Sequence, residues 1–375
     1  MMRTSLPLNV EVAVIGNGAA GQACAWNLAK KGMDVAVIGR GTSATEMSTG
    51  CALFGGNLKM GSFPEWSQAC DRVEELVLGE LPSVGLEMEG RARKESLLIT
   101  AEGTLIREHL VQKIIFNGRA EAIGRLKVGV IGPSTGGPFD IRLLTKALSS
   151  KGICIQKMEV SPKKLTQDPL TALSEAASGL SADVVFIPPF LKLHEIAEGT
   201  VKMEKSTGRK FAEPVIPLGE AGKRFSDALG RVASNNGVRQ LSHTYVDRID
   251  PNGKDICLRL SSGHTVRNLY CKAAVICGGG IVGGGLGVTG RDVIDPLGLM
   301  DIYTPEGATG VIERALASGI RTGQDLAVHV KGVKMKNMFA AGACLPGCNV
   351  VMGAGIGTAM ALGVIASEKA VEAIR

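Results

Sequence analysis

Residues 12–41 read VAVIGNGAAGQACAWNLAKKGMDVAVIGRG, and this stretch decides the expected fold. An apolar strand at 12–15 leads into the turn GNGAAG at 16–21, a helical pattern follows, and a second apolar strand covers 34–38. Strand, glycine turn, helix and strand make a βαβ unit, and such units build parallel sheets. In that context the G-x-G-x-x-G pattern indicates a dinucleotide-binding turn.

The three glycines of this turn have different expected roles. The first allows the tight turn, the second lets backbone N–H groups approach a pyrophosphate, and the third lets the helix pack on the strand. The helix N-terminus adds partial positive charge toward the phosphates. The second strand, however, ends in IGRG at 38–41, without the acidic residue that usually binds the ribose. A tight turn without a ligand is the alternative interpretation.

Composition narrows the class of protein. The chain has 375 residues, 50 of them glycine, and 45% are hydrophobic, which suits a loop-rich α/β enzyme rather than a disordered chain. The net charge of +6 is mild and no Lys/Arg run is interleaved with aromatic residues, so we do not expect nucleic-acid binding. Residues 1–8 lack the apolar core of a signal peptide, and no stretch of about 18 apolar residues occurs, so a cytoplasmic chain without its own membrane anchor is expected.

The nine cysteines are scattered without a Cys-x-x-Cys pair, so we expect reduced thiols and no metal site. Cys344 and Cys348 are the closest pair. Two small buried apolar side chains is the simpler interpretation, and a redox pair beside a cofactor is the alternative. Iron–sulfur ligation is not expected, because clusters need tighter sets of thiolates.

A second α/β layer is expected in the middle of the chain. The pattern at 127–160 is again strand, turn, helix and strand, and a helix near 169–178 and a strand at 183–187 follow. Other expected elements are a helix at 64–80, short charged strands at 87–114, a helix at 225–236, and hairpin-like strands near 238–249 and 256–270.

Two later strands also open into glycines, at 273–280 and at 338–343, and the turn at 353–358 begins a last helix at 359–374. Flavoproteins of the two-dinucleotide-binding-domain type end in this way, with the last helix N-terminus aimed at the flavin edge where negative charge develops. We therefore expect an α/β fold with a Rossmann-like FAD-binding domain at 1–90 and 240–375. An inserted α/β domain for substrate or partner is expected at 91–239.

Several segments carry a resemblance to a known family. They are GRGTSATEMSTGCALF at 39–54, VVFIPPFLKL at 184–193, PVIPLGEAGKRFSDAL at 214–229, AAVICGGGIVGGGLGV at 273–288 and KNMFAAGACLPGCNVVMGAGIGTAMALGVIA at 336–366. With these segments the chain resembles the FAD-binding fumarate reductase/succinate dehydrogenase superfamily, and within it the B subunits of anaerobic glycerol-3-phosphate dehydrogenase.

The resemblance implies a flavoprotein oxidoreductase subunit. It would relay electrons in a respiratory complex from a catalytic flavoprotein subunit towards an iron–sulfur subunit and quinone. The chain would associate with the inner face of the cell membrane only through these partner subunits. The B subunits are often assigned FMN, which has no adenosine ribose and would need no acid. We expect FAD instead, because FMN would leave the first glycine turn without a pyrophosphate; FMN is the alternative.

The expected cofactor contacts lie in the three glycine elements and in the loop after the second strand, with Arg40 and Ser43 near the adenosine. Ala343 stands where the superfamily often has Glu. The expected contacts are Gly16, Asn17, Gly18, Ala19, Ala20, Gly21, Gly39, Arg40, Gly41, Ser43, Ser48, Thr49, Gly50, Gly278, Gly279, Gly342, Ala343, Gly353, Gly355, Ile356, Gly357 and Thr358.

Catalytic residues are harder to assign. The superfamily's His and Arg set has no match here, and the five histidines, at 109, 194, 243, 264 and 329, are expected to be surface or structural residues. His194, after the Pro-Pro turn, is the candidate base. Ser134-Thr135 and Lys223-Arg224 are candidates for anion binding, with a capped turn and a solvated helix end as alternatives. A self-sufficient dehydrogenase or reductase of a small anionic substrate and a non-catalytic assembly subunit are the alternative functions.

Overall fold

The computed structural model describes residues 3–4, 6–55, 63–133, 139–252, 255–348 and 354–375. The chain divides into two compact units. Unit 1 comprises Met1–Thr45, Leu53–Leu76 and Leu229–Arg375, and unit 2 comprises Glu46–Ala52 and Val77–Ala228. These boundaries differ from the predicted 90/91 and 239/240, and the roles assigned to the two domains stay predictions.

Unit 1 is built on a mixed sheet whose central strands are parallel. The order is β12-β3-β2-β15, with β21 beside the end of β15, while β14 and β13 continue antiparallel from its first half. The strands are β2 (Leu8–Ile15), β3 (Val35–Ile38), β12 (Arg239–Leu241), β13 (Tyr245–Asn252), β14 (Asp255–Ser262), β15 (Thr265–Ile276), β20 (Ala327–Val330) and β21 (Val333–Ala340).

The strands expected near 238–249 and 256–270 and at 273–277 need correction. The segment near 238–249 contains two strands instead of one. β12 pairs with β3 in the parallel part of the sheet, and β13 pairs with β14 in the antiparallel part. The strand expected at 273–277 is the end of β15, which runs unbroken from Thr265. Burial alternates along 269–272 and is complete at 273–276, so one strand passes from a sheet with one exposed face into a fully covered core.

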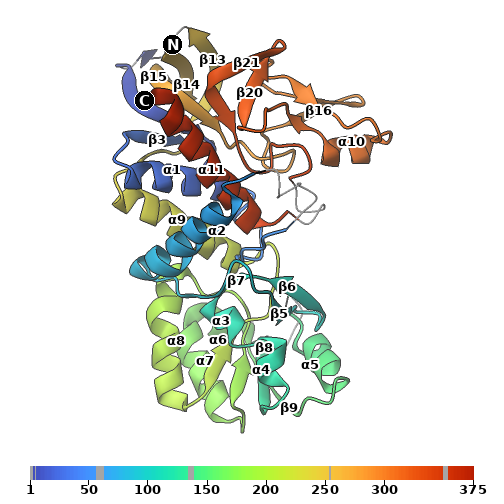
Figure 1. Cartoon of the computed structure of the whole chain (residues 1–375). Helices are drawn as coiled ribbons and strands as arrows, with labels where there is room; N and C mark the ends of the chain where they lie inside the picture. Colours follow the sequence, from blue (N-terminus) through green and yellow to red (C-terminus); the bar gives the residue numbers. More distant parts are fainter. Residues whose placement is uncertain (1–2, 5, 56–62, 134–138, 253–254, 349–353) are drawn as a thin grey trace. The chain divides into compact units, whose positions relative to one another are not determined.

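Helices α1 (Ala19–Lys30) and α11 (Ile356–Ile374) lie side by side in unit 1 (Figure 1). A Cβ at Gly363 of α11 would overlap the carbonyl oxygen of Ala20, so glycine there permits the close approach. The helix expected at 64–80 is α2 (Trp66–Glu74) followed by a π-helix at Glu75–Glu80. The helix predicted at 359–374 is α11, and it begins three residues earlier, at Ile356.

Unit 2 contains the predicted second α/β layer. Its parallel sheet has the order β11-β10-β8-β9. Val184 and Phe186 of β10 face one apolar cluster with α5, and Val185 faces another with α7 and α8, so alternate residues serve opposite faces. The elements are β8 (Val128–Pro133), α5 (Ile141–Ser149), β9 (Ile155–Val160), α6 (Pro162–Gln167), α7 (Pro169–Ser178), β10 (Val184–Phe186), α8 (Leu193–Thr207) and β11 (Lys210–Ala212).

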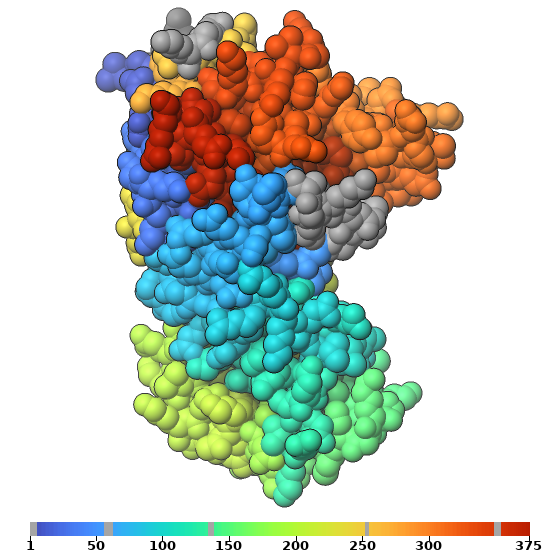
Figure 2. Space-filling view, viewed as in Figure 1, coloured from blue at the N-terminus to red at the C-terminus, as the bar shows by residue number. Residues whose placement is uncertain are grey.

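Short elements complete the two units. In unit 1, β16, β17 and α10 form an outlying part at the surface (Figure 2), and α10 buries none of its side chains. The elements are β1 (Arg3–Thr4), β4 (Met88–Gly90), β5 (Ser96–Ile99), β6 (Leu105–Glu108), β7 (Leu110–Gln112), α3 (Lys113–Phe116), α4 (Ala120–Ile123), α9 (Glu220–Asn235), β16 (Gly287–Thr289), β17 (Asp292–Ile294), β18 (Ile302–Tyr303), α10 (Val311–Ala317) and β19 (Gly319–Ile320).

Candidate functional site

Four parallel strands of unit 1 end side by side. Ile15 of β2 is paired with Ile38 of β3 and with Ile276 of β15, and Ile276 is paired with Ala340 of β21. Open parallel sheets bind ligands beyond the carboxyl ends of their strands. The fold therefore brings the predicted glycine elements to one sheet edge. A glycine follows each of the four strand ends within two residues: Gly16, Gly39, Gly278 and Gly342.

In the first turn, packing within the chain requires glycine at two of the three positions and not at the third. Gly16 has a φ of +121°, and a Cβ there would overlap the carbonyl oxygen of Cys277. A Cβ at Gly21 would overlap the carbonyl oxygen of Gly16. Gly18 has a φ of −74°, and the nearest atom to its Cβ would be Thr45 Oγ1 at 3.5 Å. No described residue lies too close to a Cβ at Gly18. A pyrophosphate that approached this backbone would need the position to be glycine, so the turn fits such a ligand.

Two helices direct their N-termini toward this edge of the sheet. Gly18 caps α1 and Gly355 caps α11; neither helix has a side-chain cap from that residue or an acid in its first turn. Thr45 Oγ1 accepts a hydrogen bond from Ala19 N at 2.9 Å, which fixes the loop after β3 on the start of α1. Because neither first turn holds an acid, no carboxylate of that turn offsets the partial positive charge that each helix end offers to an anionic group.

The space where an acid usually follows the second strand is taken by Asn17. A Cβ at Gly39 would lie 2.5 Å from Asn17 Cγ, and Asn17 Nδ2 donates to the Gly41 carbonyl oxygen at 3.0 Å. Arg40 Nη2 donates to the Gly283 carbonyl oxygen at 3.4 Å, so the exposed arginine links the loop after β3 to the segment that follows β15. Ser43 is buried.

In the last glycine element, close packing against the segment at 53–54 requires glycine at two positions. A Cβ at Gly355 would lie 2.5 Å from Leu53 Cβ, and one at Gly357 would lie 2.6 Å from the Phe54 ring. Thr358 Oγ1 donates to the Gly55 carbonyl oxygen at 2.7 Å and accepts from Gly55 N at 2.9 Å. The hydroxyl is therefore satisfied within the chain.

The second glycine element packs against the segment that follows β21. A Cβ at Gly280 would lie 2.9 Å from the carbonyl oxygen of Ala343, and Gly342 has a φ of +81°. The predicted cofactor contacts of all these segments, the first turn included, stay predictions. Gly353 lies outside the described residues.

In unit 2, the predicted contact Gly50 belongs to a buried hydrogen-bond network. Its φ is +68°, and a Cβ there would overlap the carbonyl oxygen of Ala221. Gln112 Nε2 donates to the carbonyl oxygens of Gly50 and Ala221 at 2.9 and 2.8 Å. Arg224 Nε donates to Gln112 Oε1 at 2.9 Å. Packing within unit 2 thus requires glycine at position 50.

The anion-binding interpretation of Arg224 is wrong. Its guanidinium is fully buried in an ion pair with Glu213, and Nη1 donates to the Leu191 carbonyl oxygen at 2.6 Å. The side chain is thus neither a solvated helix end nor open to a ligand, although the neighbouring Lys223 is exposed. Burial raises the pKa of Glu213, and Arg224 opposes that rise. Ser134 and Thr135 lie outside the described residues.

Sequence reasoning missed Glu108, a buried acid at the end of β6. Its carboxylate Oε1 accepts a hydrogen bond from Thr49 Oγ1 at 3.2 Å, and the buried Oε2 has no hydrogen-bond partner among the described residues. Burial raises the pKa of Glu108 from its ordinary 4.5 to about 7, opposed only by the Thr49 hydrogen bond. A single acid within the charged run IREHL carries no periodicity that would indicate burial.

Glu108→Gln is expected to flatten the pH dependence of stability. A carboxyl whose pKa is raised on folding adds stability that is complete below its unfolded value of about 4.5 and is lost as pH rises through about 7. A rise of this size corresponds to about 3 kcal/mol. Urea unfolding at pH 5 and pH 8, with the exposed Glu95→Gln as control, measures it. An unchanged difference between the two pH values in Glu108→Gln would show that this carboxyl is not the cause.

The remaining titratable candidates give no reactive site. His194 is exposed near the start of α8, and its role as a base stays a prediction. His109 is buried, and burial lowers its pKa. Cys344 and Cys348 are free and buried, and burial raises the pKa of both thiols, which disfavours the reactive thiolate. In the part of the chain that the structure describes, no cluster of acid, His and Cys side chains suits a metal ion.

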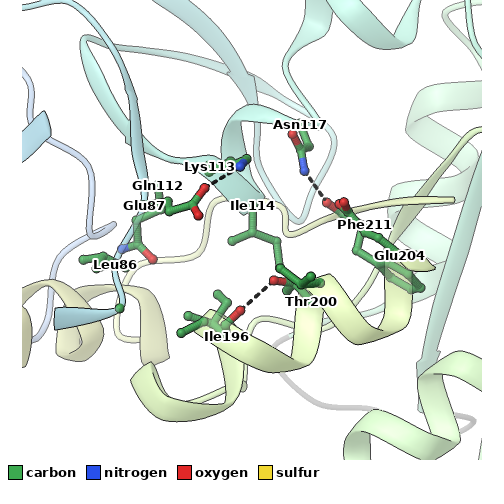
Figure 3. A pocket seen from close by; sticks show the side chains of 13 residues that line it. Leu86, Glu87, Gln112, Lys113, Ile114, Asn117, Ile196, Thr200, Glu204 and Phe211 are labelled. Carbon is green, nitrogen blue, oxygen red and sulfur yellow. Dashed lines mark hydrogen bonds and ion pairs between the residues drawn. The ribbon is translucent and has the colours of Figure 1, made fainter. Parts of the chain in front are cut away.

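Unit 2 also contains a small pocket, with a volume of about 70 Å³, between the segment of β7 and α3 and helix α8 (Figure 3). Lys113 is paired with Glu87, Asn117 Nδ2 donates to the Phe211 carbonyl oxygen at 2.9 Å, and Thr200 Oγ1 donates to the backbone of its own helix. Because these polar groups already bond within the chain, we assign no ligand to the pocket.

Part of unit 1 matches a known protein family. Residues 11–77 match the model of the FAD binding domain family. The match confirms FAD as the cofactor and the Rossmann-like character of the α/β fold. It covers the first βαβ unit and the loop that follows, where Gly18 and the start of α1 lie. No curated protein sequence matches the chain.

Solved structures are similar only at low identity. Quinol fumarate reductase FrdA of E. coli is 11% identical, with a TM-score of 0.43 over 100% of this chain and 71% of that one. A 3-ketosteroid dehydrogenase from Rhodococcus jostii RHA1 is 12% identical, with a TM-score of 0.40 over 99% and 98%. The p-nitrophenol 4-monooxygenase PnpA from Pseudomonas putida DLL-E4 is 12% identical, with a TM-score of 0.29; 72% of this chain covers only 40% of it. These values assign no activity.

Proposed function

We propose that the chain is an FAD-dependent oxidoreductase that works as the electron-relaying subunit of an anaerobic glycerol-3-phosphate dehydrogenase complex. The observation that carries the FAD part is Gly18, where no described residue lies too close to an added Cβ, in front of helix α1, whose first turn has no acid. The resemblance of the segments at 39–54, 184–193, 214–229, 273–288 and 336–366 supports the complex. Its partners would be a catalytic flavoprotein subunit and an iron–sulfur subunit, and the membrane would be reached through them.

The chain's own residues would hold the cofactor mainly through its backbone. Backbone N–H groups at the start of α1 would bind the pyrophosphate, and Arg40 and Ser43 would lie near the adenosine. The N-terminus of α11 would stabilise negative charge on the flavin ring. Bound FAD supplies two-electron chemistry. In the described part of the chain no helix is long and apolar enough to cross a bilayer.

The composition of the site favours a relay over a self-sufficient dehydrogenase. Oxidation of an alcohol needs a base within hydrogen-bond reach of its hydroxyl. Among the predicted cofactor contacts in unit 1, Arg40 is the sole side chain that carries a charge, and it is no base at neutral pH.

Anaerobic mixing with glycerol 3-phosphate separates the two functions. We expect the purified FAD-loaded chain to keep its oxidised flavin spectrum for a long time with this substrate alone, and to be reduced quickly when the partner subunits are added. Stopped-flow absorbance of the flavin measures both rates. Rapid bleaching of the isolated chain, lost in His194→Ala, would replace the relay with a self-sufficient dehydrogenase.

A further inference from the structure

We infer that unit 1 contains an anion-binding pocket in which Arg267 and Thr265 hold a phosphate group. The pocket has a volume of about 230 Å³ and lies at the end of the β14–β15 hairpin, in the antiparallel part of the unit 1 sheet. None of its lining residues is among the expected cofactor contacts, so the inference goes beyond the proposed function and does not depend on it. The lining residues are Thr244, Leu260, Ser261, Ser262, Thr265 and Arg267.

Strand pairing places Arg267 on the covered face of the sheet. It stands directly opposite Leu260 of β14, whose side chain is fully buried, and directly opposite residues share a face. Side chains alternate along β15, so Arg267 also shares its face with the buried Leu269, while Asn268 and Tyr270 are exposed on the other. A charged residue therefore occupies a position where the alternation of the strand calls for an apolar one.

The guanidinium of Arg267 has no partner in the part of the chain that the structure describes. It makes no hydrogen bond or ion pair with a described residue, although the side chain is half-buried. No acidic side chain lines the pocket. Other arginines of unit 1 pair with an aspartate, namely Arg239, Arg248 and Arg314. Partial burial of an unpaired charge is costly, so this position favours an anion from solution.

Thr265 supplies a second donor on the same face. It precedes Arg267 by two residues in β15, and its hydroxyl donates to no described residue. The other hydroxyls that line the pocket already donate within the chain, those of Thr244, Ser261 and Ser262, at 3.0, 2.9 and 2.9 Å. The donors left for a ligand are therefore the guanidinium of Arg267 and the hydroxyl of Thr265.

An acid that contacts a lining residue lies on the opposite face. Asp247 Oδ1 accepts the hydrogen bond from Ser261 Oγ at 2.9 Å. Ser261 follows the buried Leu260 in β14, so its side chain leaves the strand on the face that Arg267 does not use. The hydrogen bond thus keeps the carboxylate of Asp247 away from the guanidinium.

This donor set suits a phosphate group better than a carboxylate. The planar fork of an arginine donates to two oxygens of one anion. A carboxylate has only two oxygens, so the fork alone satisfies it. A phosphate group presents a third oxygen, which the Thr265 hydroxyl can bind. Inorganic phosphate and the terminal group of a phosphate monoester share this chemistry.

Isothermal titration calorimetry of the FAD-loaded chain with inorganic phosphate, and separately with methyl phosphate, tests the inference. Bound FAD fills the first glycine turn, so phosphate cannot bind there. We expect a Kd on the order of 1 mM. Arg267→Gln should weaken binding roughly 10-fold to 100-fold, because it removes charge-assisted hydrogen bonds. Thr265→Val should weaken it about 5-fold and Thr265→Ser should retain it.

The matched control is Arg259→Gln, which removes an exposed arginine from the other face of the same hairpin. It should bind phosphate like the wild type. Tighter binding of methyl phosphate would identify an ester ligand, and tighter binding of inorganic phosphate would identify the free ion; both support the pocket. Equal affinities in Arg267→Gln and Arg259→Gln, or no saturable binding to the wild type, would overturn the inference.

Nitrogen–proton NMR of the wild type gives a readout that does not depend on how well a variant folds. The Nε–H signal of Arg267, assigned by its absence in Arg267→Gln, should shift along the same titration curve. A signal that stays unchanged at saturating phosphate would overturn the inference. If the chain binds no FAD, the proposed function fails, and the same titration of Gly18→Val, in which a side chain fills the first turn, still tests the pocket.

Discussion

Replacement of Gly18 by valine is expected to give a folded chain that no longer retains FAD. Gly18 has an ordinary φ, and the nearest atoms to an added Cβ would be Thr45 Oγ1 at 3.5 Å and Ser43 Cβ at 3.8 Å. The described residues therefore leave room for a Cβ at this position. The pyrophosphate does not, because its oxygens must approach the backbone N–H groups at the start of α1.

The expected loss is large because the phosphate bonds are charge-assisted. Loss of two such bonds, at about 1.5–3 kcal/mol each, lowers affinity roughly 100-fold to 10,000-fold. Flavin absorbance of the purified variant and the mass of the nucleotide released on denaturation measure the effect. The wild type should release FAD rather than FMN.

The matched control for this variant is Gly307→Val. That glycine is exposed, and a Cβ there would have no atom within 4 Å. This control should keep its full flavin content, and both variants should unfold at nearly the wild-type temperature. A Gly18→Val protein that purifies with a full complement of FAD would show that the pyrophosphate binds elsewhere.

Replacement of Arg224 by methionine should be the most destabilising change within unit 2. Arg224 and Glu213 are both fully buried, so the variant leaves an unpaired carboxylate and removes the donors to Gln112 Oε1 and the Leu191 carbonyl oxygen. Breaking a buried ion pair in this way costs about 3–5 kcal/mol. The cost should be smaller at low pH, because burial already raises the pKa of Glu213 and its protonation removes the charge.

Urea unfolding of three variants distinguishes the buried ion pair from general loss of packing. The double variant Arg224→Met/Glu213→Leu should recover most of the stability, since no charge remains buried. Arg248→Met, which breaks the exposed pair with Asp250, should unfold like the wild type. Equal losses in the single and the double variant would mean that packing of the Arg224 side chain, rather than its charge, stabilises this region.

Local patterns in the sequence identified the glycine elements that the fold brings to one edge of the unit 1 sheet. The turn at 16–21 and the later glycine segments stand next to apolar strands, and each of these signals lies within a few neighbouring residues. The parallel α/β layer at 127–187 was predicted for the same reason. The continuous strand β15 was not, because its burial changes from one face to two only where β2 and β21 pair with its second half.

The sequence by itself determined the βαβ unit, the three glycine elements and hence the FAD assignment, because turn geometry and strand periodicity depend on adjacent residues. Only the tertiary structure decided which polar groups are buried and which side chains they meet. Asn17 takes the space beside Gly39, Arg224 is buried against Glu213, and Glu108 meets Thr49 from 59 residues away. These outcomes depend on desolvation and on hydrogen bonds between distant segments, which no local pattern contains.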